Sequence, residues 1–87
     1  MIVVSDTSPI SNLIHIQCEQ LLVELFGQVI VPPAVAHELQ VEHYPLPAFV
    51  QIQQPTDTGA VRRLTVLLDA GEAEAIVLAR QLHADRL

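Results

Sequence analysis

Two short runs of mostly apolar residues constrain the fold of this chain most, because helix-start signals follow each of them. The run Ile2–Ser5 comes shortly before Ser8-Pro9, which reads as a serine N-cap followed by a proline at the first helical position. The β-branched run Val29–Val31 is closed by a pair of prolines, the second of which opens another helix. Buried strands that alternate with helices predict an α/β fold with a mostly parallel sheet.

The rest of the chain extends this pattern into one small domain, residues 1–87. Helices are predicted at 9–16, 19–26, 33–39, 61–68 and 70–83, and a short third strand is predicted at 49–53. In an α/β fold, the last long helix should lead into another parallel strand. That strand would begin near Arg86-Leu87, where the sequence stops. We therefore expect the last strand to be missing and the domain to be incomplete at its C-terminus.

Composition bears on partners and compartment. Hydrophobic residues make up 51% of the chain and mean hydropathy is +0.40. A domain of this size leaves much of its surface exposed, so a homodimer, a higher oligomer or a covering partner protein is expected. No apolar run is long enough to cross a membrane, and the N-terminus does not resemble a signal peptide. The single cysteine, Cys18, excludes an internal disulfide and suits a reducing prokaryotic cytoplasm.

The charge of the chain argues against simple electrostatic binding of nucleic acid. The net charge is -6, there is no lysine, and there are only four arginines. If the protein handles a phosphate backbone, bound cations must offset its carboxylates. Acidic clusters that hold Mg²⁺ or Mn²⁺ work in this way.

Three acids are candidates for such a cluster. Asp6 follows the first strand, at the edge where α/β sheets gather ligands, and Ser8 is predicted to cap the helix in its place. A turn aspartate that bonds nearby backbone is the alternative for Asp6. Glu38 lies in the helix that Pro33 opens, where a solvated surface acid is the alternative.

Glu72 is the third candidate. On a helical wheel it shares a face with Ile76, Ala79 and His83, whereas Glu74 lies about 200° away, so the two glutamates cannot face one cavity. If one of them points inward, it is Glu72. The alternative is a capping box with Asp69, and the two roles are compatible.

Three segments together resemble PIN-domain nucleases. They are the opening strand and turn, Ile2–Ile10; the second strand and the helix after it, Val29–Leu39; and the segment Leu68–Ala79. The last contains Gly-Glu-Ala-Glu-Ala-Ile, which is similar to a motif of a prokaryotic, VapC-like branch of toxin ribonucleases. The resemblance implies a Rossmann-like, three-layer parallel sheet flanked by helices.

The resemblance also implies a site and a function. Asp6, Glu38 and Glu72 occupy the positions of catalytic acids, with Asp6 and Glu72 as ligands of Mg²⁺ or Mn²⁺. Glu38 would orient or deprotonate the attacking water. Thr7, Ser8 and Asn12 are the polar neighbours expected to contact substrate. The implied activity is metal-dependent cleavage of single-stranded RNA by the toxin of a toxin–antitoxin pair, with an antitoxin-like protein as partner.

Two other functions stay open at this point. The last strand of the family carries a further acid, and the sequence ends before it. Weak metal binding and little turnover are therefore expected. The chain could equally be a non-catalytic interaction or dimerisation module derived from a PIN domain, or a fragment of a longer protein.

Overall fold

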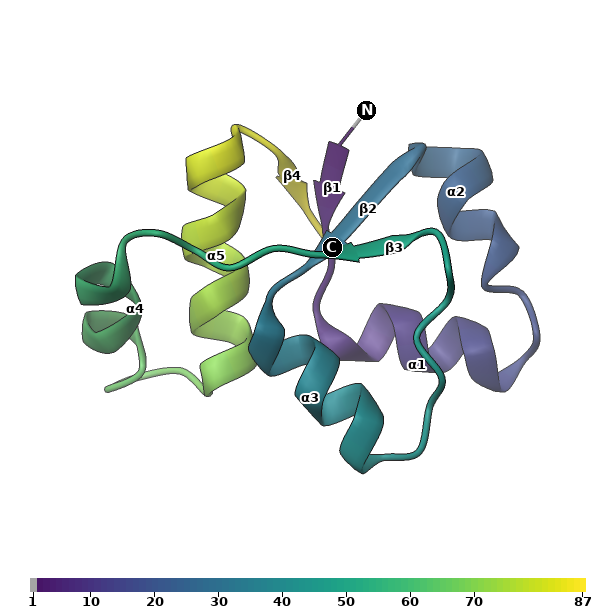
Figure 1. Cartoon of the computed structure of the whole chain (residues 1–87), viewed down its shortest axis with the longest axis horizontal. Coiled ribbons are helices and arrows are strands. Elements are labelled where there is room, and N and C mark those ends of the chain that lie inside the picture. The colour runs from purple at the N-terminus through teal and green to yellow at the C-terminus, as the bar shows by residue number, and fades with distance from the viewer. Residues whose placement is uncertain (1) are drawn as a thin grey trace.

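The protein is a four-stranded parallel sheet with helices on both faces, seen in a computed structural model that describes residues 2–87 (Figure 1). The strands are β1 (Ile2–Val4), β2 (Gln28–Val31), β3 (Val50–Ile52) and β4 (Asp85–Arg86). The helices are α1 (Thr7–His15), α2 (Gln20–Phe26), α3 (Pro33–Val41), α4 (Thr58–Leu64) and α5 (Ala70–Leu82). The predicted fold class is confirmed, and so is the weakly patterned third strand.

The order of strands across the sheet is β3-β2-β1-β4, and every neighbouring pair is parallel. Val3 pairs with Val29, which pairs with Val50, so one face of the sheet presents a row of valines. Because alternate residues point to opposite faces, Val4 and Ile30 lie on the other side. The short apolar runs are therefore buried on both faces, as parallel strands usually are.

The two faces are covered by different kinds of side chain. On the valine face, large aliphatic residues of α1, α2 and α3 pack against the strands, namely Ile10, Leu22, Val35 and Leu39. On the other face, α5 contributes mostly small residues, Ala75 and Ala79, beside Leu78. Helix α4 packs on the outside of α5 (Figure 1). Small residues let α5 approach the sheet closely, and they also bring its first turn near α3.

The first helix begins earlier than predicted. Asp6 is its N-cap: the backbone is extended there, and the Asp6 side chain accepts a hydrogen bond from the Thr7 amide. Ser8 therefore lies inside the helix, and the assignment of the cap to Ser8 was wrong. Asp6 caps the helix because it lies where the chain leaves the strand. Pro9 is still within the first helical turn, where a missing backbone N–H costs little.

The chain end also differs from the prediction. Asp85 and Arg86 form β4, which pairs with Val3 and Val4 of β1. The Leu87 amide donates to the Val4 carbonyl at 2.9 Å, and the Asp6 amide donates to the Leu87 carbonyl at 3.3 Å. The first two residues of the strand that we expected to be missing are therefore present as β4, and the residue after them, Leu87, bonds to Asp6. Within residues 2–87 no helix is both long and apolar enough to cross a membrane.

Candidate active site

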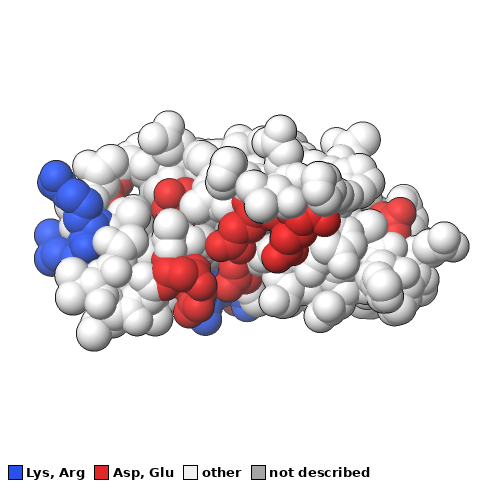
Figure 2. Space-filling view, turned by 90° about the horizontal axis from the view of Figure 1, so that it is seen from below, with Lys and Arg blue, Asp and Glu red and all other residues white. Residues whose placement is uncertain are grey.

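Acidic side chains gather at the carboxyl end of the sheet. The strands β1 and β2 both run toward this edge, so the residues that follow them, the start of α1 and the start of α3, meet there (Figure 1). The first turn of α5 packs against α3 at the same end. Figure 2 views the molecule from this side and shows several acidic side chains close together in the middle of the face. Parallel sheets collect ligands at this edge.

Asp6 is held firmly at this edge. Its Oδ1 accepts the Thr7 amide at 2.8 Å, and its own amide donates to the carbonyl of Leu87, the residue after β4. The buried Ser5 hydroxyl donates to the Asp6 carbonyl at 2.9 Å. The cap uses one carboxylate oxygen and fixes the side chain in place. Asp6 can therefore bond the nearby backbone and still offer its other carboxylate oxygen to a ligand.

Glu38 reaches the same place from α3. The hydroxyl of Thr7 donates to Glu38 Oε2, and Thr7 is only 7% exposed. This hydrogen bond joins the residue next to Asp6 to an acid 31 positions away in the sequence. The structure therefore brings two of the predicted acids to neighbouring positions, and it shows that Glu38 is not simply a solvated surface residue.

Gly71 explains how the third segment comes so close. A Cβ atom at this position would lie 3.2 Å from Glu38 Oε1, 3.4 Å from Val35 Cγ2 and 3.5 Å from Asp69 Oδ1. Only glycine leaves this gap open without displacing a neighbour. The first turn of α5 therefore lies directly against the carboxylate of Glu38.

Glu72 adds its charge to this cluster. A hydrogen bond and the negative charge of Asp69 act first to raise the pKa of Glu72 above its ordinary value of 4.5, followed by partial desolvation and the negative charge of Asp6. The guanidinium of Arg86, in β4, lowers it. The raised pKa of Glu72 thus comes mainly from Asp69 in the same turn, with a smaller contribution from Asp6 at the start of α1. Asp69, which the sequence suggested only as a cap, thus belongs to the cluster, and we call Asp6, Glu38, Asp69 and Glu72 the acidic face.

The capping box of α5 is only half formed. Asp69 Oδ1 accepts the Glu72 amide at 2.8 Å, as predicted for the N-cap. The Glu72 side chain instead interacts with the Asp69 carboxylate. The face of α5 that packs on the sheet is made of Ala75, Leu78 and Ala79. Of the residues predicted to share a face with Glu72, Ala79 lies on this buried side, whereas Ile76 is only half-buried.

Glu74 has a separate, structural role. Its Oε1 accepts the Ala34 amide at 3.0 Å, at the first turn of α3. Pro32 stands at the N-cap of that helix and has no side-chain donor or acceptor for it, so Glu74 satisfies the exposed amide from outside. Glu72 and Glu74 therefore have different partners, in agreement with the prediction that they do not face one cavity: Glu72 interacts with Asp69, and Glu74 with the Ala34 amide. No pattern in the sequence predicted this contact between residues 40 positions apart.

The predicted substrate-binding residues lie along the start of α1, but in different surroundings. Thr7 is buried and bonded to Glu38, so its hydroxyl positions that acid. Ser8 and Asn12 are exposed on the helix surface. Both are free to meet a ligand that approaches α1, whereas Thr7 is not.

The donor atoms of the acidic face suit Mg²⁺ or Mn²⁺, which prefer carboxylate oxygens. Their arrangement is looser than a finished metal site. In the part of the chain that the structure describes, no three His, Cys, Asp or Glu side chains are grouped so that they could hold a metal ion. The carboxylate oxygens are the type of ligand that a hard cation prefers, but side chains would have to rotate to bring three of them together.

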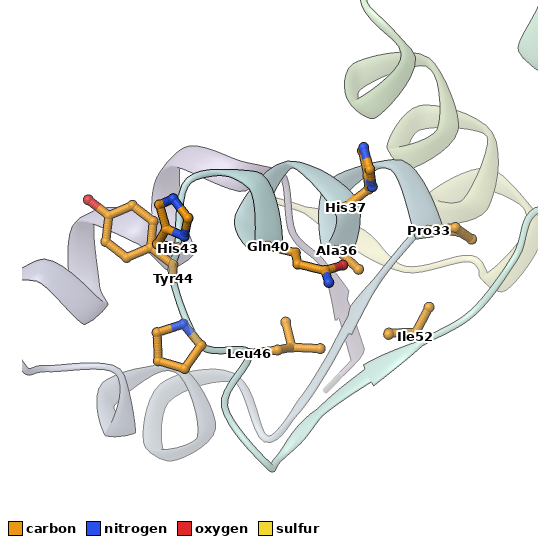
Figure 3. A pocket seen from close by; sticks show the side chains of 9 residues that line it. Pro33, Ala36, His37, Gln40, His43, Tyr44, Leu46 and Ile52 are labelled. Atoms are coloured by element: carbon orange, nitrogen blue, oxygen red, sulfur yellow. The ribbon is translucent and has the colours of Figure 1, made fainter.

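A hollow of about 630 Å³ lies away from these acids, between α3, the loop after it and β3 (Figure 3). Its lining is mostly apolar, with Ala36, Leu46 and Ile52 among the residues around it, and it contains no acidic side chain. His37 and His43 are at its rim, both exposed. The hollow therefore offers no carboxylate ligands for a metal ion.

Comparison with known proteins agrees with this geometry. The chain matches the family DUF3368, described as a PIN domain, over residues 2–87. A search of the curated proteins and a search of the solved structures each found no significant match. The family match spans nearly the whole sequence, and it coincides with a parallel sheet that carries acids at its carboxyl end. The chain belongs to the PIN-domain family.

Proposed function

We propose that this protein is a metal-dependent endoribonuclease that uses Mg²⁺ or Mn²⁺ and cleaves single-stranded RNA at the acidic face. The observation that carries the proposal is the hydrogen bond from Thr7 to Glu38. It ties the start of α1, where Asp6 sits, to the acid of α3, and the first turn of α5 lies against the same carboxylate. Membership of the PIN-domain family supports nuclease chemistry at this place.

Each acid has a distinct part in the proposed reaction. Asp6 and Glu72 would hold the cation, because they approach from α1 and α5 with carboxylate oxygens. When bound, the cation would polarise the phosphate and lower the pKa of a water molecule. Glu38, oriented by Thr7, would accept the proton of the attacking water. Ser8 and Asn12, exposed beside this point, would contact the RNA.

We infer that the biological role is that of the toxin in a prokaryotic, cytoplasmic toxin–antitoxin pair. The Gly71–Ile76 motif at the start of α5 supports this role by resemblance. Exposed apolar side chains on several elements support a homo-oligomer or an antitoxin-like partner, among them Ile16, Leu25 and Val41. A small antitoxin gene beside this one, and growth arrest that its product relieves, would be the matching genetic observation.

Cleavage of a labelled single-stranded RNA with Mn²⁺ or Mg²⁺ tests the enzymatic proposal. Asp6→Asn and Glu38→Gln should each reduce the rate at least about 100-fold, because each removes a charge that acts on the reacting groups. Glu74→Gln is the matched control: it is on the same helix as Glu72 but contacts only α3 backbone, so its rate should stay within about threefold of wild type. Full activity in both Asp6→Asn and Glu38→Gln would refute the proposal.

A non-catalytic interaction module is the second candidate. It is favoured by the absence, among residues 2–87, of three acids already grouped for a metal ion. It predicts that Mn²⁺ leaves the NMR signals of Asp6 and Glu72 without paramagnetic broadening at millimolar concentration. Broadening confined to the acidic face would favour the enzyme.

A further inference from the structure

The few positive charges of this protein are unevenly distributed. The chain has only four arginines and no lysine, against ten acids. Two of the four, Arg63 and Arg80, line one cleft of about 550 Å³ between α4 and α5. Figure 2 shows basic side chains gathered over the α4 end of the molecule, and a few others beside the acids in the middle. We call this hollow the arginine cleft.

The arginine cleft has an aliphatic floor and a charged rim. Leu64 of α4 and Ile76 and Val77 of α5 contribute the apolar lining. Arg63 and Arg80 each lie in the last turn of their helix and are exposed, so their guanidinium groups are available to a ligand. An arginine fork suits a carboxylate or a phosphate, which it can bind through two parallel hydrogen bonds.

The remaining polar groups of the cleft do not cancel this charge. Gln81 Oε1 accepts both the amide and the hydroxyl of Thr56, at 2.8 Å and 3.1 Å, which fixes the amide group and leaves its N–H donors for another partner. Asp57 is the acid in the lining; its Oδ1 caps α4 by accepting the Ala60 amide at 3.0 Å, and its negative charge offsets one of the two arginines. The cleft therefore presents hydrogen-bond donors and a net positive charge to an incoming anion.

The lining favours a peptide over a nucleic acid. It contains no aromatic side chain on which a base could stack. Directly after α4, the turn exposes Val66 and Leu67, which are 81% and 85% accessible, so apolar surface continues along the chain from the cleft. Apolar side chains bordered by arginine are typical of protein interfaces. Carboxylates would meet the arginines, and aliphatic side chains would meet the floor.

We propose that the arginine cleft binds a peptide segment of a partner protein in which acidic and aliphatic residues alternate at short spacing. The site is separate from the acidic face and does not depend on nuclease activity. Its ligand is recognised by two guanidinium groups of different helices, so both arginines contribute to affinity.

Selection from a random twelve-residue peptide library on the immobilised protein tests this proposal. Enriched peptides should combine Asp or Glu with Leu, Ile or Val, and their amide shift changes in NMR spectra should map to α4 and α5. Each of Arg63→Ala and Arg80→Ala should weaken binding of an enriched peptide about tenfold, since arginine contacts often dominate an interface. Arg62→Ala is the matched control, because Arg62 is the neighbouring residue of α4 and does not line the cleft.

Three results would overturn the proposal: no enriched sequence, enrichment of basic peptides, or affinity that Arg63→Ala and Arg80→Ala leave unchanged. Competition by a single-stranded RNA that depends on both arginines would assign the cleft to nucleic acid instead. Because both arginines are exposed, these variants should remain folded, which circular dichroism would verify.

Discussion

The acidic face and the arginine cleft handle charge in different ways. On the acidic face, the neighbouring carboxylate of Asp69 raises the pKa of Glu72 most, and the carboxylate of Asp6, from the start of α1, raises it further. In the arginine cleft, two cations from neighbouring helices border an aliphatic floor. The acidic face presents carboxylate oxygens, whereas the arginine cleft presents guanidinium groups beside aliphatic side chains.

The separation of charge is partial, because Arg86 acts on Glu72 and lowers its pKa, whereas Asp57 lines the arginine cleft. If the acidic face binds a metal ion and the arginine cleft binds an acidic peptide, as proposed, a variant in one region should leave the other ligand's binding unchanged.

Among the variants that compare these two regions, Thr7→Val should have the largest effect, because it removes the hydroxyl that holds Glu38. Loss of such a supporting hydrogen bond typically costs about 10- to 100-fold in metal affinity or activity. RNA cleavage should fall by this factor, whereas binding of a selected peptide to the arginine cleft should not change. Steady-state cleavage and fluorescence anisotropy measure the two properties on the same preparation.

Thr65→Val is the control for this substitution. The Thr65 hydroxyl donates to the Arg62 carbonyl in an exposed turn after α4, far along the chain from Glu38. Its cleavage rate should match wild type. Equal losses in both threonine variants would mean that the Thr7 hydroxyl has no particular role at the acidic face.

The next effect concerns cation binding. If Asp6 and Glu72 hold Mn²⁺, free Mn²⁺ at a hundred times its Kd should raise the free energy of unfolding by about 2.7 kcal/mol. The gain should disappear in Asp6→Asn and persist in the double variant Arg63→Ala/Arg80→Ala. Thermal unfolding with and without Mn²⁺ provides the measurement, and an identical gain in Asp6→Asn would place the ion elsewhere.

A smaller effect separates two glycines. Gly59→Ala in α4 should stabilise the protein by about 0.5–1 kcal/mol, because alanine favours helix and no neighbouring atom lies closer than 3.5 Å. Gly71→Ala should lose this gain, since its Cβ meets Glu38 Oε1 at 3.2 Å and Val35 at 3.4 Å. We expect a difference of about 1 kcal/mol between the two variants in urea unfolding. Equal stabilisation would show that the first turn of α5 can move away from α3.

The sequence predicted the fold well because its signals are local. Apolar runs, prolines and the Gly27 stop fix strands and helix ends without reference to the rest of the chain, and Gly27 does adopt a positive φ of 80°. Helix starts were predicted less well: α1 and α4 begin at Thr7 and Thr58 because Asp6 and Asp57 cap them. For α1, either Asp6 or Ser8 could have been the N-cap, and the N-cap is the one that lies where the chain leaves β1.

The site was predicted only in outline, because its contacts are not local. That Asp6 and Glu38 meet follows from the parallel sheet, but the Thr7 hydroxyl between them could not be derived from spacing. Asp69 was read as a cap alone, although its carboxylate also acts on Glu72. Glu74 shows the limit most clearly, since its partner is a backbone amide exposed by a proline-headed helix elsewhere.

The smallest effect concerns pH and the acidic face. The pKa of Glu72 is raised in the folded protein, so the folded state binds this proton more tightly than the unfolded chain. As pH rises from about 4.5 through the raised pKa, Glu72 should therefore lower the stability of wild type, while Glu72→Gln should not show this component. The stability of the variant relative to wild type should increase from pH 4.5 to pH 7 in urea unfolding. A difference between Glu72→Gln and wild type that does not vary with pH would mean that Asp69 and Asp6 do not raise the pKa of Glu72.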